Sequence, residues 1–484
     1  MIIFLIGHDF KYETEATVKL FFPAMRFTFC TEDAPRQEDY IRTSLAGETI
    51  LAESSLSGVF RRSEAQLPQH ADKRTAEHAL CTLLYEHLTE ATGITPPWGM
   101  MTGIRPVRML TAAVEQGSTL EDAVQAMGQT YRVSEQKLAL AKETARVQLP
   151  LLGRLGPDVV SLYISIPFCP SRCSYCSFVS HSIAEAGKLI PAYVDCLCRE
   201  LSIWGELIRR LELKLDTVYI GGGTPTAISA EQLGQIMDAV RANMHMDPVR
   251  EYTVEAGRPD TITPEKLEVI RSHGATRISI NPQTLNDKVL RAIGRKHTAQ
   301  QAVDAFRLAR SLGFANINMD LIAGLPEDTP DSFRDTLDRV IALDPESITV
   351  HTLTLKRSAA LYAQGGSQIA NPAAAMVDYS VRRLPEAGYR PYYLYRQKNT
   401  LENLENVGYA KPGFESLYNI LIMDETQTIL GAGCAASTKL VTPDGQITRI
   451  HNHKFPYEYI GRFDSLMEKK QQIDQILGGN SHGA

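Results

Sequence analysis

The sequence predicts an α/β protein built around a partial (β/α)6 barrel. From about Ser161 onwards, short β-rich runs alternate with helical stretches, which is the pattern of repeated βα units around a parallel sheet. Polar and glycine-rich motifs follow directly after these runs, where barrel proteins carry their reactive groups. Because a closed barrel needs eight units, six units predict an open one. The six candidate strands are 162–166, 217–220, 252–255, 277–280, 317–322 and 347–352.

The regions on either side of the barrel have a different pattern. Residues 1–150 carry β-rich runs such as 21–29 before helical stretches begin at about Lys73, so they predict a separate N-terminal α+β domain to which no role is assigned. The barrel is expected over 151–395. Beyond it the alternation fades, and 396–484 are expected to form a C-terminal extension that covers the barrel opening.

Composition excludes several classes of protein. With 484 residues, 44% of them hydrophobic and 22% charged, an ordinary soluble globular protein is expected. Lys and Arg number 50 against 56 Asp and Glu, and the net charge of -6 without a basic run argues against a nucleic-acid partner. No run approaches the roughly 18 apolar residues of a membrane span, and the first residues predict a strand rather than a signal sequence. A cytoplasmic location is therefore expected.

Three of the eight cysteines form a CxxxCxxC motif, Cys169, Cys173 and Cys176, after the first barrel strand. This clustering favours a metal site over a disulfide framework. Thiolates are the soft ligands of iron–sulfur clusters, so the motif predicts a 4Fe–4S cluster in which the protein binds three irons. The fourth iron stays open to the amine and carboxylate of an amino acid that also carries a sulfonium. The alternative is a structural zinc site or a ferredoxin cluster; both normally need a fourth protein ligand, for which His181 is the nearest candidate.

Further candidate ligand groups lie at the ends of other barrel strands. Gly221-Gly222-Gly223-Thr224-Pro225 either exposes backbone N–H groups to a carboxylate or is an ordinary turn. Glu255 and Asp320 need partners when they are buried, and the hydroxyls or amine of a nucleoside-bearing ligand would provide them. Arg277 and Arg295 are the alternative partners, in salt bridges within the barrel.

The fourth βα unit also carries polar groups. Asn281, Gln283 and Arg295 can pair with a carboxylate or with the edge of an adenine. His297 follows closely and is expected to be a surface histidine rather than an acid or base.

Taken in order, these motifs resemble the radical S-adenosylmethionine superfamily and, within it, the oxygen-independent coproporphyrinogen III oxidase (coproporphyrinogen dehydrogenase) family, over about residues 160–440. The HemZ-type branch is the most similar in three stretches. These are Arg277-Ile-Ser-Ile-Asn-Pro-Gln283, Asn403-Leu-Glu-Asn-Val-Gly-Tyr-Ala-Lys-Pro-Gly413 and Trp98-Gly-Met-Met-Thr-Gly-Ile-Arg-Pro106.

The resemblance implies a role for each motif. Tyr163-Ile-Ser-Ile-Pro-Phe-Cys169 aligns with the family motif YxHIPFC, so Tyr163 would contact the methionine end of a first S-adenosylmethionine. The residues implied to bind that first molecule are Tyr163, Tyr175, Gly222 and Glu255, those implied for a second one are Gly223, Thr224, Gln283, Arg295 and Asp320, and those implied in catalysis are Tyr163, Gln283 and Arg295.

By the same resemblance, the expected reaction is the oxidative decarboxylation of coproporphyrinogen III in haem biosynthesis. An electron from a flavodoxin- or ferredoxin-type carrier would enter the cluster, and a 5′-deoxyadenosyl radical would take a β-hydrogen from a propionate. Loss of carbon dioxide, together with transfer of one electron to a final electron acceptor, would leave a vinyl group, and two rounds would give protoporphyrinogen IX. Arg396 and Lys398 are candidates for meeting a substrate carboxylate, or else form a solvated surface pair.

Three positions depart from the family pattern. Ser165 replaces the histidine of YxHIPFC, Phe178 stands where established oxidases carry a fourth cysteine, and Asn281-Pro282 replaces Gly-Val. Two other functions therefore stay open: a radical methyltransferase or other carbon-radical enzyme on a different substrate, and a haem-binding or haem-delivery protein. The related haem-chaperone branch carries HNxxYW, whereas the aligned stretch here is Tyr418-Asn-Ile-Leu-Ile-Met423.

Overall fold

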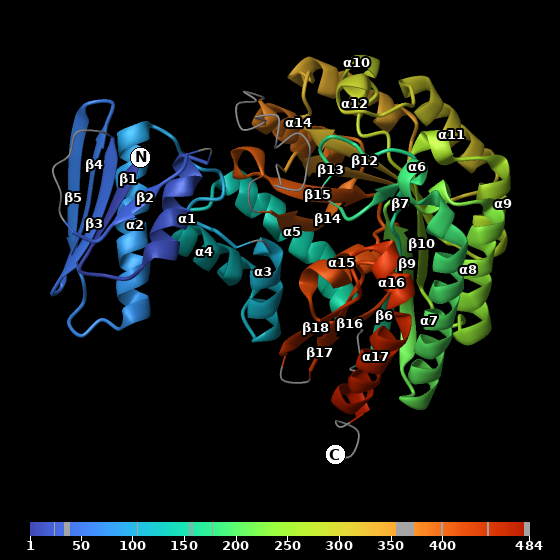
Figure 1. Cartoon of the computed structure of the whole chain (residues 1–484). Helices are drawn as coiled ribbons and strands as arrows, with labels where there is room; N and C mark the ends of the chain where they lie inside the picture. The colour runs from blue at the N-terminus through green and yellow to red at the C-terminus, as the bar shows by residue number, and fades with distance from the viewer. Residues whose placement is uncertain are drawn as a thin grey trace. The chain divides into compact units, whose positions relative to one another are not determined.

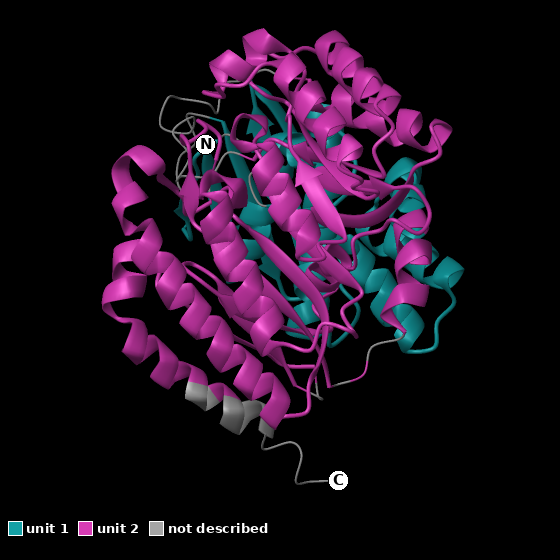
Figure 2. Cartoon of the chain, turned by 90° about the vertical axis from the view of Figure 1, so that its right-hand side faces the viewer, with its two compact units in different colours: residues 1–142, 396–404 teal, residues 143–395, 405–484 magenta. Residues whose placement is uncertain are grey.

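Figure 1 shows the protein as a computed structural model. The structure describes residues 1–23, 25–32, 39–103, 105–153, 156, 158–176, 178–354, 372–397, 400–442 and 445–478. It divides into two compact units, residues 1–142 with 396–404 and residues 143–395 with 405–484 (Figure 2). The region predicted as 396–484 is therefore shared between the two units instead of forming a third part, and the first boundary lies at 142 instead of 150.

The first unit contains a five-stranded sheet in the order β2-β1-β3-β4-β5, together with helices. Among the described residues of the run predicted as β-rich over 21–29, only the last two lie in a strand, so this prediction is wrong for the others. Phe21 ends helix α1 and its ring packs 5.6 Å from that of Tyr85, so tertiary packing overrides the strand preference of an aromatic residue. Helix α2 begins at the predicted position, because the Asp72 side chain accepts a hydrogen bond from Thr75 N. The elements are β1 (Ile2–Ile6), α1 (Lys11–Phe21), β2 (Thr28–Cys30), β3 (Tyr40–Ala46), β4 (Thr49–Leu56), β5 (Val59–Gln66), α2 (Lys73–Thr92), α3 (Pro106–Glu115), α4 (Leu120–Tyr131) and α5 (Glu135–Leu152), within which the first unit ends.

The second unit contains the predicted partial barrel. Six parallel strands lie side by side in chain order, β6-β9-β10-β11-β12-β13, with helices between them, so all six predicted strands are confirmed. Capping boxes at Ser229 and Thr298 define where α8 and α11 begin. The strands are β6 (Val159–Ile166), β9 (Lys214–Gly222), β10 (Glu251–Gly257), β11 (Arg277–Ile280), β12 (Ile317–Ala323) and β13 (Ser347–Thr352); the helices are α6 (Ile183–Ala186), α7 (Ile190–Arg210), α8 (Ala230–Asn243), α9 (Pro264–Ser272), α10 (Asp287–Ala292), α11 (Ala299–Ser311), α12 (Pro330–Ala342), α14 (Ala373–Glu386), α15 (Leu417–Asp424), α16 (Pro456–Gly461) and α17 (Phe463–Gly478).

Later strands extend this sheet at both edges (Figure 1). At one edge β15 (Glu405–Ala410) runs antiparallel to β13, with β14 (Arg390–Arg396) beyond it. At the other edge β16 (Thr428–Ala432) runs parallel to β6, followed by β17 (Ser437–Val441) and β18 (Ile447–His451). The described residues therefore form an open sheet of eleven strands.

A buried ion pair ties the C-terminal helix α17 to α7. Glu200 on α7 is fully buried and accepts hydrogen bonds from Gly433 N at 2.8 Å and from Asn452 Nδ2 at 2.9 Å. Lys470 on α17 donates to the same carboxylate and lies 4.2 Å from the ring centroid of Trp204. Because several donors share the buried charge, its desolvation is offset, and the C-terminal helix packs with the barrel.

The barrel strands place apolar and polar side chains on opposite faces of the sheet. In β12, Met319 and Leu321 are fully buried, whereas Asn318 and Asp320 lie on the other face. The strand registers align such polar positions across the barrel, and we call the face that they form the inner face. Its residues include Tyr163, Thr217, Tyr219, Glu255, Ser279, Asn318, Asp320, Thr349 and His351. Across the described parts of the chain, no helix has both the length and the apolar character to cross a membrane.

Candidate functional site

The three clustered cysteines lie on one tight loop at the end of β6. Cys169 is buried in β7 (Phe168–Cys169), which pairs with β8 (His181–Ser182). Cys173 and Cys176 are half-buried, and Cys176 N donates a hydrogen bond of 3.1 Å to Cys173 O. All eight cysteines of the chain are free thiols. His181, the candidate for a fourth ligand, packs its ring edge-on against Phe455 with 5.8 Å between centroids.

Neighbouring βα units hold this loop in place. Arg258 Nη1 donates hydrogen bonds to the backbone oxygen and to Oγ of Ser171, at 3.0 and 2.9 Å. Arg295 Nη2 donates to the hydroxyl of Tyr175 at 3.0 Å, and Ser174 N donates to a backbone oxygen just before Arg295. Contacts from the third and fourth units thus fix the loop that carries the thiols.

The environment of the thiols fits a cluster of soft metal ions. Burial raises the pKa of the Cys169 thiol, and it raises the pKa of Cys176 to about 11, so both stay protonated unless a cation compensates the thiolate charge. Thr224 Oγ1 donates to Cys169 Sγ at 3.4 Å. Among the described residues, no three His, Cys, Asp or Glu side chains are placed to hold a single metal ion. In a 4Fe–4S cluster each thiolate binds a different iron, so the three thiols need not converge on one metal ion. Three thiols on one loop are a set of donors that is compatible with such a cluster.

The glycine-rich turn packs tightly against the segment that leads to Cys169. A Cβ on Gly223 would lie 2.7 Å from Phe168 O, and Gly222 has a φ of +109°. Gly223 N donates to Ile166 O and Thr224 N donates to Phe168 O, both at 2.8 Å. These two N–H groups are therefore used within the fold, so Gly223 and Thr224 would have to contact a ligand through their other atoms.

An aromatic stack and a carboxyl group lie together on the inner face. The rings of Tyr219 and Tyr418 are 4.3 Å apart, and Tyr163 lies about 6 Å from each of them. Tyr219 donates a hydrogen bond of 2.5 Å to Glu255 Oε1. Burial raises the pKa of Glu255 to about 7, with a smaller contribution from the charge of Asp320, while the bond from Tyr219 opposes the shift.

The second carboxyl group of the inner face has the opposite shift. Asp320 Oδ1 accepts a hydrogen bond of 2.6 Å from Asn318 Nδ2, and Oδ2 lies 3.8 Å from Nε2 of His351. Burial favours the neutral acid, but His351, Asn318 and Thr349 together outweigh it and hold the pKa of Asp320 below its usual value. His351 is also 3.4 Å from the hydroxyl of Tyr395.

Gln283 and Arg295 both carry features that suggest a ligand. Gln283 is buried with a φ of +68°, a conformation that costs energy for a residue other than glycine, and its N–H donates to Asp320 O. Arg295 is buried, and its Nε has no hydrogen-bond partner among the described residues. Arg277 donates to Asn316 Oδ1 and to a backbone oxygen, not to a barrel carboxylate. The described residues therefore do not form the salt bridges that were the alternative for Arg277 and Arg295.

Three residues differ from the sequence expectation or were missed. His297 is buried next to Asp260, and burial together with Arg295 lowers its pKa to about 4, so the expectation of a surface histidine is wrong. Arg258 and His351 were missed. The signal for both was their position directly after, or at the end of, a barrel strand.

Arg396 is structural, which corrects its suggested role as a partner for a substrate carboxylate. Within the first unit its Nη1 donates to Met101 O at 2.5 Å, its Nη2 donates to Asn403 O, and its guanidinium lies 5.5 Å from the ring centroid of Trp98. Lys398, the other residue suggested for this role, lies outside the described residues.

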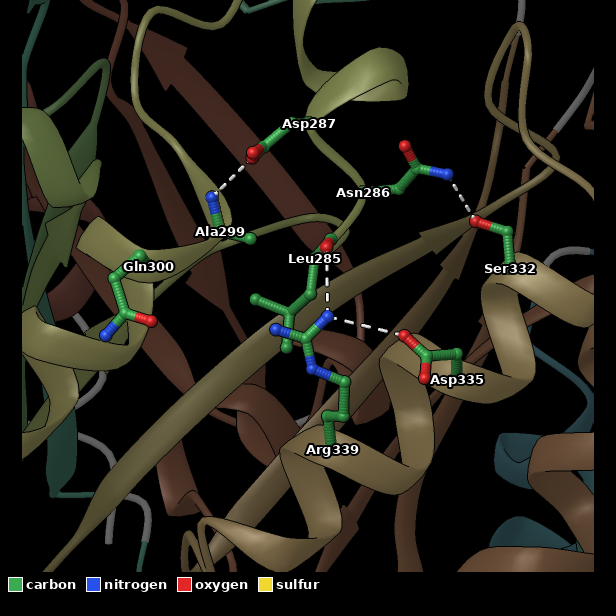
Figure 3. Close-up of a pocket in the computed structure, with 8 residues that line it drawn as sticks. All are labelled: Leu285, Asn286, Asp287, Ala299, Gln300, Ser332, Asp335 and Arg339. Carbon is green, nitrogen blue, oxygen red and sulfur yellow. Dashed lines mark hydrogen bonds and ion pairs between the residues drawn. The ribbon is translucent and has the colours of Figure 1, made fainter.

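A pocket of about 480 Å³ lies between the N-terminal ends of α10 and α11 and the helix α12 (Figure 3). Its polar groups bond to each other: Asn286 Nδ2 donates to Ser332 Oγ, and Arg339 donates to Leu285 O. None of the predicted site residues is among its lining residues, which are Leu285, Asn286, Asp287, Ala299, Gln300, Ser332, Asp335 and Arg339.

Comparisons with known proteins agree with this fold and site. The radical SAM superfamily model matches residues 163–340, which include the cysteine loop and both inner-face carboxyl groups, so the fold and site define a radical SAM protein. The chain belongs to the oxygen-independent coproporphyrinogen-III oxidase-like family: it is 42% identical over 417 residues to the oxygen-independent coproporphyrinogen-III oxidase-like protein HemZ of Bacillus subtilis, covering 84% of this chain and 82% of that one.

More distant relatives were also found. The haem chaperone HemW of Haemophilus influenzae is 32% identical over 317 residues, which is 64% of this chain and 78% of that one. The solved structure of coproporphyrinogen III oxidase HemN from Escherichia coli superposes with a TM-score of 0.51 at 23% identity, covering 66% of this chain and 72% of that one. This likeness shows a shared fold, and the predicted family resemblance is confirmed.

Proposed function

We propose that the protein is a radical SAM enzyme that oxidatively decarboxylates propionate groups of coproporphyrinogen III to vinyl groups without oxygen. The observation that carries this proposal is the fixed three-cysteine loop beside an inner face with two carboxyl groups, in a chain 42% identical to a coproporphyrinogen-III oxidase-like protein.

The site residues divide into three groups under this proposal. Cys169, Cys173 and Cys176 would hold the cluster, which supplies the electron that cleaves S-adenosylmethionine to a 5′-deoxyadenosyl radical. A flavodoxin- or ferredoxin-type carrier would provide that electron. The residues proposed to bind a first S-adenosylmethionine are Tyr163, Tyr175, Gly222 and Glu255, and those for a second are Gly223, Thr224, Gln283, Arg295 and Asp320.

The inner face supports binding of a cationic, hydroxyl-bearing ligand. Asp320 is held ionised by its neighbours and can pair with an amine or with hydroxyl groups. Glu255, with a pKa of about 7, can accept or release a proton near neutral pH. The ring of Tyr219, stacked on that of Tyr418, provides a flat apolar wall beside them that excludes water. We also propose catalytic roles for Tyr163, Gln283 and Arg295, because these residues would contact the bound S-adenosylmethionine.

A haem-delivery function is the second candidate, because HemW chaperones are among the relatives. Tyr418 stands where the chaperone motif has its histidine, and its ring is only 6% exposed within the tyrosine stack. A buried ring in this position supports the enzyme over a protein that offers this residue to haem iron.

The test is to reconstitute the cluster without oxygen, add S-adenosylmethionine and a reductant, and follow 5′-deoxyadenosine with and without coproporphyrinogen III. A product lighter by two carbon dioxides and four hydrogen atoms supports the oxidase. Formation of 5′-deoxyadenosine with unchanged porphyrinogen would reject this substrate, and a methylated product would identify a methyltransferase. A fully loaded protein that forms no 5′-deoxyadenosine but binds haem stoichiometrically would favour haem delivery.

A further inference from the structure

A buried guanidinium lies directly behind the cysteine loop. Arg258 follows the last residue of β10, is only 3% exposed, and donates through Nη1 to both oxygens of Ser171. The same Nη1 lies 4.0 Å from Cys173 Sγ, within hydrogen-bond range for a sulfur acceptor. Arg258 therefore contacts one of the three thiols proposed to bind iron.

Asp260 fixes the direction of this guanidinium. Arg258 Nε and Nη2 donate to the two oxygens of the Asp260 carboxylate at 2.9 and 2.6 Å, which is a bidentate pair. With these two nitrogens held by Asp260, Nη1 is the one that faces the loop. The geometry does not depend on a flexible surface side chain, because Arg258 is buried.

The charge around the loop is positive on balance. Arg295 is also buried, and its Nη2 donates to Tyr175 in the same loop. Counting only these groups, the two buried guanidinium groups and the carboxylate of Asp260 leave a surplus of one positive charge next to the thiols. Three thiolates and an iron–sulfur core are anionic as a set, so this surplus is complementary to them.

We propose that Arg258 sets the reduction potential of the cluster by placing a buried positive charge and an N–H donor at the Cys173 sulfur. The inference rests on the proposed function, since it needs a cluster on the three cysteines. Reduction by one electron, taken from an external donor, adds a negative charge without making or breaking a bond to the protein. A fixed cation nearby stabilises the reduced form more than the oxidised form and makes the potential less negative.

The test is a mediated redox titration of the anaerobically reconstituted 484-residue protein, read by electron paramagnetic resonance. Arg258→Gln removes the charge, and we expect the equilibrium constant for reduction to fall by about tenfold, which is about 59 mV more negative for a one-electron couple. Asp260→Asn removes the opposing charge and should shift the potential in the other direction. A merely structural role would not reverse the sign between the two variants.

Arg250→Gln is the matched control. Arg250 immediately precedes β10 at its other end and makes the same bidentate pair, with Asp216, at 2.6 and 2.8 Å. This variant should keep the wild-type potential, and iron content is measured for all proteins.

The possible outcomes separate the two proposals. Wild-type potentials in Arg258→Gln and Asp260→Asn would overturn this inference, and so would shifts of the same sign in both. If Arg258→Gln does not retain iron, the reduction potential of Asp260→Asn decides: a less negative potential supports the inference, and an unchanged or more negative one overturns it. A wild-type protein that binds no cluster would reject the proposed function itself. If the two variants shift the reduction potential in opposite directions but the wild type leaves porphyrinogen unchanged, only the proposed substrate is rejected.

Discussion

The hydroxyl of Tyr219 donates a hydrogen bond of 2.5 Å to Oε1 of Glu255, which joins the tyrosine stack to a carboxyl group on the inner face. Burial raises the pKa of Glu255 to about 7, so its charge changes near neutral pH. The partners of Asp320 instead keep its pKa below the usual value. The inner face therefore carries Glu255 and Asp320 with pKa values shifted in opposite directions, which under the proposed function would separate their roles in pairing and proton transfer.

Replacing Glu255 by Gln should stabilise the ligand-free protein at high pH. The folded protein binds the Glu255 proton more tightly than the unfolded chain, because burial raises the pKa from 4.5 to about 7. Stability of the wild type is therefore lost as the pH rises from about 4.5 through 7, whereas Gln has no charge to desolvate. Allowing for partial solvent access, the advantage of E255Q should grow by on the order of 1–2 kcal/mol between pH 5 and pH 8. Melting temperatures at the two pH values measure it.

The control for this experiment is Glu268→Gln, an exposed glutamate on α9. Its melting temperature should follow that of the wild type at both pH values. An E255Q protein whose advantage over the wild type is the same at pH 5 and pH 8 would show that Glu255 is not the carboxyl group with the raised pKa.

Replacing any one of Cys169, Cys173 or Cys176 by Ala should abolish stable binding of the cluster. Each thiolate would bind a different iron, so no remaining thiol can substitute for the missing one. Iron and sulfide content after anaerobic reconstitution and formation of 5′-deoxyadenosine measure the effect. Cys198→Ala is the control, because this half-buried thiol lies on α7, outside the cysteine loop, and donates to the backbone oxygen of Gln235. Full iron content in a variant of the loop would remove that cysteine from the proposed ligands.

Most of the barrel could be predicted because its strands carry a simple pattern. In β12, alternate residues such as Met319 and Leu321 face the helices, and the polar residues between them face inward, so a carboxylate such as Asp320 within an apolar run marks the inner face. The cysteine loop was predictable for a similar reason, since its residues are close in sequence. Local patterns of this kind do not depend on how distant segments pack.

What the sequence did not reveal depends on contacts between distant segments. Arg258 and Ser171 are 87 positions apart, so the position of Arg258 after β10 marks it as a candidate site residue but does not indicate that it holds the cysteine loop. His297 is buried although its neighbours in sequence are polar, because the loop between α10 and α11 packs it near Asp260. Ser165 could be recognised from the sequence as a departure from the family. The sequence did not show that its backbone oxygen accepts a hydrogen bond from Tyr193 on α7.

Replacing His351 by Asn should make binding at Asp320 sensitive to acid. His351 is the largest of the influences that lower the pKa of Asp320, and without it burial favours the neutral acid. The proposed second equivalent of S-adenosylmethionine should bind H351N and wild type similarly at pH 8, but H351N about tenfold more weakly at pH 5.5. Equilibrium dialysis at both pH values measures the stoichiometry and affinity. Asp320→Asn should weaken the second equivalent at both pH values.

Other titratable groups near Asp320 also influence its charge, so the control must replace a histidine that lies away from all of them. The groups that interact with it electrostatically are His351, Glu255, Tyr219, Tyr392 and Tyr393, and Tyr395 contacts His351. His273→Asn removes a histidine that pairs with Asp238 at 3.1 Å on the outer helices and should leave binding unchanged. Equal pH dependence in H351N and wild type would show that His351 does not govern the charge of Asp320.

Replacing Gly223 by Ala should disturb both stability and the cysteine loop. The added Cβ would lie 2.7 Å from Phe168 O and 3.0 Å from Ile166 O, and backbone atoms inside a sheet cannot move away as a side chain can. The segment leading to Cys169 must shift, so we expect a loss of about 2 kcal/mol in the free energy of unfolding together with a lower iron content. Gly461→Ala is the control, since its Cβ would meet nothing within 4 Å. Thermal unfolding and iron analysis of both variants measure the difference, and wild-type values for G223A would mean that the close approach of Gly223 to this segment is not required.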